Sequence, residues 1–225
     1  MSYNTAMKRI NAVLIAILML AVSGVYAQND PMPDEIVRKT TEEIISLIKA
    51  NRAAYAQDLT KLYAMVDQKV LPHFDFERMS QWILGRYWRQ ANKDQRARFI
   101  KEFRELLVRT YATALLNYTD QEVVYAPFSG KPEDEEAVVK TEIKPTGGGP
   151  SIPIQYAFYH KKPGGWKVYD LTIDGVSLVV NYRATYAAKL KQEGIDAVIA
   201  SIAAKNKQMS NKPPPPPPLK PKSQP

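Results

Sequence analysis

The two histidines of this chain are its most versatile side chains for metal binding, and they lie far apart in the sequence. His73 and His160 do not fall within a few residues of a second ligand, which is the spacing typical of zinc motifs. The chain also has no cysteine. We therefore predict no metal site, and we interpret His160, at the end of a predicted strand, as a surface group.

Nucleophilic and phosphate-binding chemistry has equally little support in the pattern of residues. Ser177 lies in the sequence DGVSL, which does not match the strand-to-helix elbow of a hydrolase, and we expect this serine to cap a helix. The glycines at 147–149 are followed by a predicted strand rather than by a helix, so they do not form a phosphate-binding loop. We predict no catalytic residue.

Asp170 and Asp174 are the carboxylates that could still support catalysis. A sheet curled over helices can enclose a pocket in which one buried carboxylate acts as a general base. However, Asp170 alternates away from the apolar residues Tyr169 and Leu171, and Asp174 lies in a predicted turn, where aspartate is common.

Three arginines, Arg86, Arg89 and Arg183, are predicted to lie near the ends of such a pocket. A guanidinium group binds phosphate well, so these residues are candidates for contact with a phosphate-bearing head group. A surface salt bridge is the plainer interpretation of each one taken singly.

One predicted helix carries most of the apolar surface that must position any site. Residues 92–118 read NKDQRARFIKEFRELLVRTYATALLNY, and Asn92 with Gln95 is typical of a capping box at the start of the helix. Apolar side chains then recur at three- and four-residue steps. A stripe this wide must be covered on two sides, or covered on one side while it faces an apolar cavity on the other.

The remaining periodicity predicts helices over residues 33–52, 57–70 and 75–84, before the long helix. Alternating patterns then predict four strands near residues 123–125, 137–144, 152–158 and 166–173. Two last helices are predicted from Ser177 to residue 190 and over 195–205, separated by Gly194. This order predicts an α+β fold, in which a four-stranded antiparallel curved sheet packs against a helical layer.

The first 27 residues are typical of a cleaved secretory signal peptide. Lys8 and Arg9 precede an uncharged apolar run at 12–22, and Val25-Tyr26-Ala27 matches a small-residue cleavage site. The run is too short to span a membrane. Because the chain has no cysteine for a lipid anchor or a disulfide, we expect a soluble protein of the bacterial periplasm.

Residues 208–225 are predicted to form a disordered tail rich in proline and lysine, with six consecutive prolines at 213–218. A docking peptide, or a cationic strip that touches anionic membranes, is the alternative. Two positive charges in the signal peptide and five lysines in or just before the tail account for seven of the net charge of +8, which leaves about +1. This distribution does not favour a nucleic-acid partner.

The apolar residues of the long helix and the strands are predicted to face one another. They either fill a solid core or surround an apolar cavity for a ligand, and periodicity does not separate these two possibilities. The residues are Phe99, Phe103, Leu106, Leu107, Tyr111 and Leu115 on the helix, and Val139, Ile143, Ile154, Tyr156, Phe158, Tyr169, Leu171 and Ile173 on the strands.

Two long runs, LGRYWRQANKDQRARFIKEFRELLVRTYATAL and GGWKVYDLTIDGVSLVVNYRATY, resemble the MlaC/toluene-tolerance family of periplasmic phospholipid-binding proteins. The resemblance covers about residues 35–205 and not the tail. It implies that residues 28–207 are a lipid-binding α+β domain with no cofactor, and that phospholipid is its cargo. It further implies a monomeric carrier between an outer-membrane lipoprotein–porin complex and an inner-membrane ABC transporter, which maintains outer-membrane lipid asymmetry.

Under this hypothesis the acyl chains enter between the face of the long helix from Phe99 to Leu115 and the strand residues, while the head group stays near the arginines. Two hypotheses from other classes remain. A small-pocket enzyme of the cone-shaped α+β type predicts a compact pocket with one buried aspartate, and an envelope scaffold predicts a solid core with partners bound by the tail.

Overall fold

A computed structural model describes residues 30–117, 120–145 and 149–211. The predicted signal peptide, and most of the predicted tail, lie outside the described residues. Among the helices that are described, none is both long enough and apolar enough to cross a membrane.

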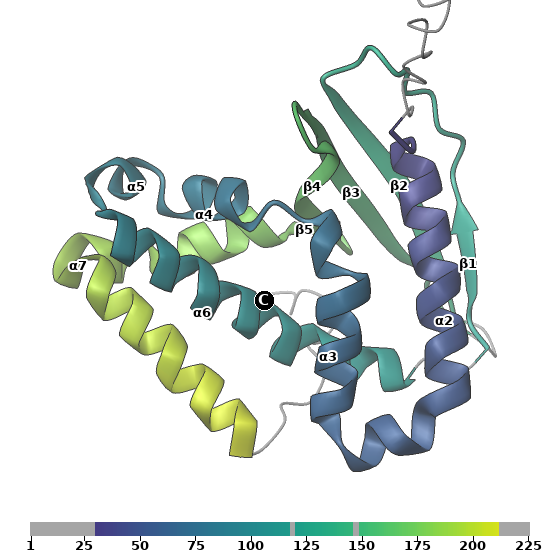
Figure 1. The fold of residues 1–225 in the computed structure, drawn as a ribbon, viewed down its shortest axis with the longest axis horizontal. Coiled ribbons are helices and arrows are strands. Elements are labelled where there is room, and N and C mark those ends of the chain that lie inside the picture. Colours follow the sequence, from purple (N-terminus) through teal and green to yellow (C-terminus); the bar gives the residue numbers. More distant parts are fainter. Residues whose placement is uncertain (1–29, 118–119, 146–148, 212–225) are drawn as a thin grey trace, which may run out of the picture. The chain divides into compact units, whose positions relative to one another are not determined.

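The helices precede and follow a sheet, in the predicted order (Figure 1). The first helix continues five residues beyond the predicted end at residue 52, to Gln57. The long predicted helix ends earlier than expected, at Tyr111, and its last turns are a 3-10 helix. The elements are α2 (Pro33–Gln57), α3 (Leu59–Lys69), η1 (Leu71–His73), α4 (Phe76–Leu84), α5 (Arg86–Gln90), α6 (Lys93–Tyr111), η2 (Ala112–Asn117) and α7 (Leu178–Asn211).

The start of α6 is the capping box that the sequence predicts. The Asn92 side chain accepts a hydrogen bond from the Gln95 backbone N–H at 2.8 Å, and the Gln95 side chain accepts one from the Asn92 N–H at 3.0 Å. Two of the backbone donors that a helix leaves unpaired are thereby satisfied.

The sheet has five antiparallel strands in sequential order, one more than predicted. The strands are β1 (Glu122–Tyr125), β2 (Glu136–Lys144), β3 (Ile152–Lys161), β4 (Gly165–Ile173) and β5 (Val176–Ser177). Only two residues long, β5 carries no alternation that a sequence pattern could reveal. It follows a tight turn in which Asp174 and Gly175 take φ of 49° and 81°, a conformation that glycine and aspartate tolerate.

A β-bulge in β4 corrects the predicted direction of Tyr169. Ala157 pairs with Asp170 while Phe158 pairs with Val168, so Tyr169 is an extra residue on its strand. The alternation therefore reverses at this point. Val168 faces the same side as Leu171 and Ile173, whereas the ring of Tyr169 contacts Trp82 and Tyr159.

The two halves of α7 meet at Gly194, as predicted, where φ of 80° and ψ of −177° break the helix. The second half packs against α6, and Met209 near its end is buried. Because α7 continues to Asn211, residues 208–211 belong to this helix rather than to the tail in which they were predicted.

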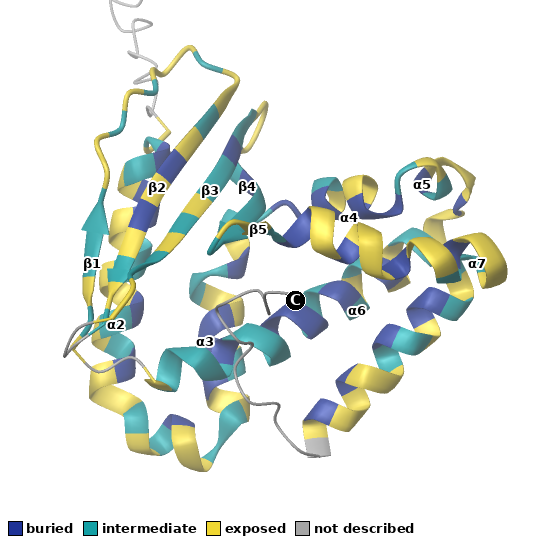
Figure 2. Cartoon of the chain, turned by 180° about the vertical axis from the view of Figure 1, so that it is seen from behind, coloured by how far each residue is buried: buried dark blue, intermediate teal, exposed yellow. Residues whose placement is uncertain are grey.

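Two apolar clusters form the core. The larger cluster lies among α3, α4, α6, α7 and the C-terminal part of α2, and the smaller one lies between the start of α2 and the inner face of the sheet. Exposed and less exposed residues alternate along β2 (Figure 2), so one face of the sheet is covered and the other is open.

The segment from η1 to α4 attaches the helices to the sheet. Phe74 bridges Val168 in parallel, and the Asp75 backbone N–H donates to the Val168 carbonyl at 2.9 Å. The buried Asp75 carboxylate accepts hydrogen bonds from the Tyr159 hydroxyl and, at 2.8 Å, from Lys161 Nζ. Burial alone would raise the pKa of Asp75, but these bonds outweigh it and lower the pKa.

Replacing Asn92 with alanine is expected to lower the free energy of unfolding by about 1 kcal/mol, because one α6 donor loses its cap. Urea denaturation measures the change. Lys93→Ala, one position further along and exposed, is the matched control and is expected to stay within about 0.5 kcal/mol of wild type. Equal unfolding midpoints for the two variants would contradict the capping role.

Candidate functional site: an apolar cavity between the helices and the sheet

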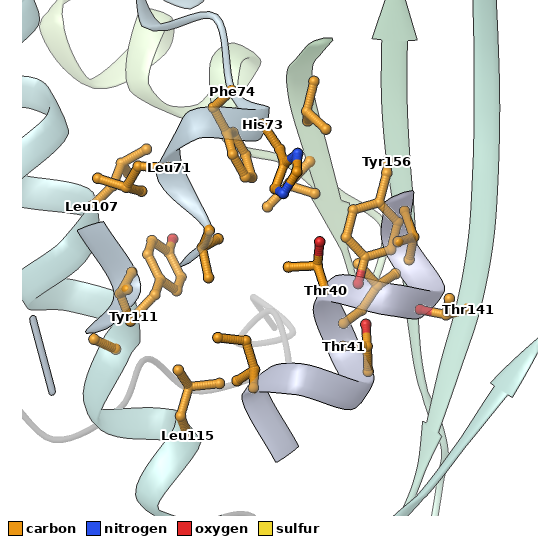
Figure 3. Close-up of a pocket in the computed structure, with 18 of the residues that line it drawn as sticks. Thr40, Thr41, Leu71, His73, Phe74, Leu107, Tyr111, Leu115, Thr141 and Tyr156 are labelled. Atoms are coloured by element: carbon orange, nitrogen blue, oxygen red, sulfur yellow. The ribbon is translucent and has the colours of Figure 1, made fainter. Parts of the chain in front are cut away.

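A cavity of about 320 Å³ lies between α2, α3, the end of α6 and the inner face of the sheet (Figure 3). Its volume falls in the range of roughly 300–1,000 Å³ that is typical of small-molecule sites. The interior of the protein is therefore not solid throughout. In this region the apolar residues surround a cavity and do not form a filled core.

The cavity wall is apolar and carries no ionic charge. Its residues are mainly isoleucine, leucine, valine and phenylalanine, and no aspartate, glutamate, lysine or arginine is among the described residues that line it. The polar side chains in the wall are Thr40, Thr41, His73, Tyr111, Thr141 and Tyr156. Burial raises the pKa of Tyr111 and of Tyr156, so both phenols are neutral at physiological pH.

The structure brings nine of the fourteen predicted apolar residues together in this wall. The nine are Leu107, Tyr111, Leu115, Ile143, Ile154, Tyr156, Phe158, Leu171 and Ile173.

The five other predicted residues lie outside the cavity wall. Phe103 packs edge-on against Tyr182 with ring centroids 5.1 Å apart, because α7 covers this part of α6. Phe99 and Leu106 are fully buried in the same cluster, Val139 is buried in the cluster beneath α2, and Tyr169 is turned outward by the bulge. The hypothesis that acyl chains run along the whole face from Phe99 to Leu115 therefore has to be corrected to the C-terminal part of that face.

None of the three arginines lines the cavity. Arg86 and Arg89 are exposed on α5, where the Arg86 guanidinium lies 5.0 Å from the Tyr87 ring centroid. Arg183 is exposed on the first half of α7, beside Gly85. A head-group role for these residues stays a prediction.

The largest contribution that the sequence did not assign to the site comes from α2. Seven of its residues, spaced over three turns, form one side of the cavity: Ile36, Val37, Thr40, Thr41, Ile44, Ile45 and Ile48. The apolar stripe of this helix is visible in the sequence, but nothing in its period distinguishes a stripe that meets the sheet from one that stands away from it.

The residues considered for catalysis do not meet in the cavity. The Asp170 carboxylate accepts hydrogen bonds from the Ser177 hydroxyl and, at 3.0 Å, from the Val179 backbone N–H. The Ser177 hydroxyl in turn accepts from the Val180 N–H at 3.1 Å, so both residues cap the start of α7, as predicted for Ser177. Across the described part of the chain, no three histidine, aspartate or glutamate side chains gather as a metal site would require.

His73 lies in the cavity wall, whereas His160 stacks on Trp166 with ring centroids 4.9 Å apart. Burial lowers the pKa of His73, the positive charge of Lys167 lowers it further, and the carboxylate of Glu43 opposes them. The imidazole is therefore neutral at physiological pH and adds no charge to the wall.

The fold and the cavity together define an α+β protein in which a single open antiparallel sheet packs on helices around an uncharged apolar interior. The chain belongs to the MlaC protein family, whose model matches residues 38–204. The resemblance seen in the sequence is thus confirmed.

Two curated relatives and one solved structure show the same relationship. The intermembrane phospholipid transport system binding protein MlaC of Haemophilus influenzae is 28% identical over 171 residues, which cover 76% of this chain and 80% of that protein. Toluene tolerance protein ttg2D of Pseudomonas putida is 26% identical over 182 residues, with 80% and 83% covered. A phospholipid-binding protein from Ralstonia solanacearum, solved in complex with a phospholipid, has a TM-score of 0.71 and 32% identity, and covers 78% of this chain and 97% of its own.

We predict that His73 makes folding sensitive to acid. In the unfolded chain the imidazole takes up a proton at its ordinary pKa of 6.5, whereas in the folded protein it does so only at lower pH. Stability is thus complete above about pH 6.5 and falls as the pH drops from there to the lowered folded pKa. Thermal unfolding of His73→Leu between pH 7.5 and 5 should show a weaker dependence on pH than wild type, and an unchanged dependence would refute the assignment.

Proposed function

We propose that this protein is a periplasmic phospholipid carrier and that the cavity shelters the acyl chains of its cargo. The observation that carries the proposal is the cavity itself, which is apolar, uncharged and of ligand size. Two relatives support the same assignment, one a phospholipid transport binding protein and the other a phospholipid-binding protein solved in complex with a phospholipid.

The energetics of lipid transfer explain why such a carrier needs this cavity. Moving a methylene group from a bilayer into water costs about 0.8 kcal/mol, so two exposed acyl chains cost on the order of tens of kcal/mol. An apolar wall offsets this cost because it replaces the bilayer interior as the surroundings of the chains. No bond has to be made or broken in this process.

The enzyme hypothesis has less support than the carrier. It requires a carboxylate inside the pocket, yet the described wall has none, and the candidate Asp170 is engaged at the start of α7. We therefore propose that the protein is not an enzyme and that phospholipid is bound as cargo, without a cofactor.

The proposal also includes the route along which the protein carries phospholipid. We place the protein, as a monomer, between an outer-membrane lipoprotein–porin complex and an inner-membrane ABC transporter, where it would maintain lipid asymmetry of the outer membrane. The charged head group stays outside the cavity, because burying an unpaired phosphate in an uncharged apolar wall would be prohibitively costly. The predicted signal peptide supports export to this compartment.

Organic extraction of the purified protein, followed by mass spectrometry, should release phospholipid, and the protein should also acquire lipid from vesicles. Ile143→Trp places a large side chain in the cavity wall of β2 and should lower lipid occupancy several-fold. Leu107→Asp places a charge in the wall and should do the same.

Val138→Trp is the matched control for these variants. This residue lies on the same strand, is 48% exposed and does not line the cavity, so its lipid occupancy should equal that of wild type. Circular dichroism must show each variant folded. If no lipid is extracted or acquired by wild type, or if the control loses as much lipid as Ile143→Trp, the carrier proposal fails.

A further inference from the structure

The apolar cavity contains one cluster of hydroxyl groups. Thr40 and Thr41 on α2, Thr141 on β2 and Tyr156 on β3 all line the wall. Figure 3 shows the Tyr156 hydroxyl above that of Thr41, with Thr40 on one side and Thr141 on the other, where α2 faces the sheet. A cluster of neutral polar groups in an otherwise apolar wall is the usual means of fixing the orientation of a ligand.

Thr141 is the member of the cluster that indicates a ligand, because its hydroxyl is buried without a hydrogen-bond partner. The residue is 2% exposed, and its Oγ1 has no hydrogen-bond partner among the described residues. Burial raises the pKa of Tyr156, and the nearby Thr141 hydroxyl opposes this rise. The distance and angles between these two hydroxyls do not make a hydrogen bond, so Thr141 Oγ1 stays unpaired. Leaving a buried polar atom of this kind unpaired is unfavourable unless a ligand or a water supplies its partner.

The surroundings of the cluster define the partner that would suit it. No cation is among the described residues of the wall, which disfavours a phosphate or a carboxylate as the buried group. A hydroxyl group can donate to a neutral oxygen, and the first neutral oxygens above the acyl chains of a diacyl lipid are its ester carbonyls.

We infer that the cluster formed by Thr40, Thr41, Thr141 and Tyr156 binds an ester carbonyl of the cargo and so distinguishes ester-linked from ether-linked lipids. The inference rests on the proposed carrier function and adds a selectivity to it. An ether-linked lipid keeps the head group and the chains but lacks the carbonyl, so Thr141 Oγ1 loses the carbonyl acceptor that this binding mode provides.

The test measures binding of a diester phosphatidylethanolamine and of its diether analogue with equal chains, each presented in vesicles to the delipidated full-length protein. A hydrogen bond contributes about 0.5–1.5 kcal/mol, so wild type should prefer the diester by about twofold to twelvefold. Thr141→Val, which keeps the shape and removes the hydroxyl, should bring the ratio close to one, and Tyr156→Phe should reduce it.

Ile154→Val is the control, because it changes the size of a neighbouring wall residue without removing a hydroxyl, and it should keep the wild-type ratio. Equal binding of the two lipids by wild type, or a ratio unchanged in Thr141→Val, would mean that the hydroxyls hold only water and would overturn the inference. Failure of wild type to bind either lipid would instead overturn the carrier proposal.

Discussion

The cavity depends on the way in which the helices are attached to the sheet. The attachment is made at the β4 edge, where Phe74 bridges Val168 and where Asp75 accepts hydrogen bonds from Tyr159 and Lys161 of β3. On the other side, α2 packs over β2. Between these two contacts, part of the inner face of the sheet is separated from the helices by the cavity, which apolar side chains line.

The division of α6 between two environments follows from α7. In the first half of α7, Tyr186 and Tyr182 pack against Phe99 and Phe103, which are fully buried together with Leu106. After the break at Gly194, the second half runs along α6 from Asp196, beside Arg98, to Met209, beside Thr110. The C-terminal part of α6, with Leu107 and Tyr111, is left to face the cavity. One wide apolar stripe thus supports a solid core that stabilises the fold and a wall that is open to a ligand, which a stripe of ordinary width could not do.

Much of the fold could be predicted because it is encoded locally. The Asn92 capping box, the break at Gly194 and the cap at Ser177 each depend on a few neighbouring residues, and all three are confirmed. The fold class is also confirmed, with one strand more than predicted. The bulge at Tyr169 could not be foreseen, because it depends on how β4 pairs with β3 rather than on the sequence of either strand.

The residues of the cavity wall could be predicted only in part, again because some of them depend on how distant segments pack. The strand residues that line the cavity alternate cleanly up to the bulge, but the residues of α6 were assigned to one surface although α7 divides them. The role of α2 was missed because its stripe, from Ile36 to Ile48, has the same period whether it packs tightly or bounds a void. Whether an apolar surface is filled or left open is decided by tertiary distances, which no single helix or strand encodes.

The central claim is that acyl chains occupy the space between α2, the end of α6 and the sheet. A crystal structure of the protein loaded with a phospholipid brominated along its acyl chains would locate those chains directly, by anomalous scattering from the bromine atoms. If the acyl chains occupy this space, bromine peaks are expected beside Leu107, Ile143 and Tyr156. Peaks confined to the outer surface, with the cavity filled by protein side chains, would contradict it.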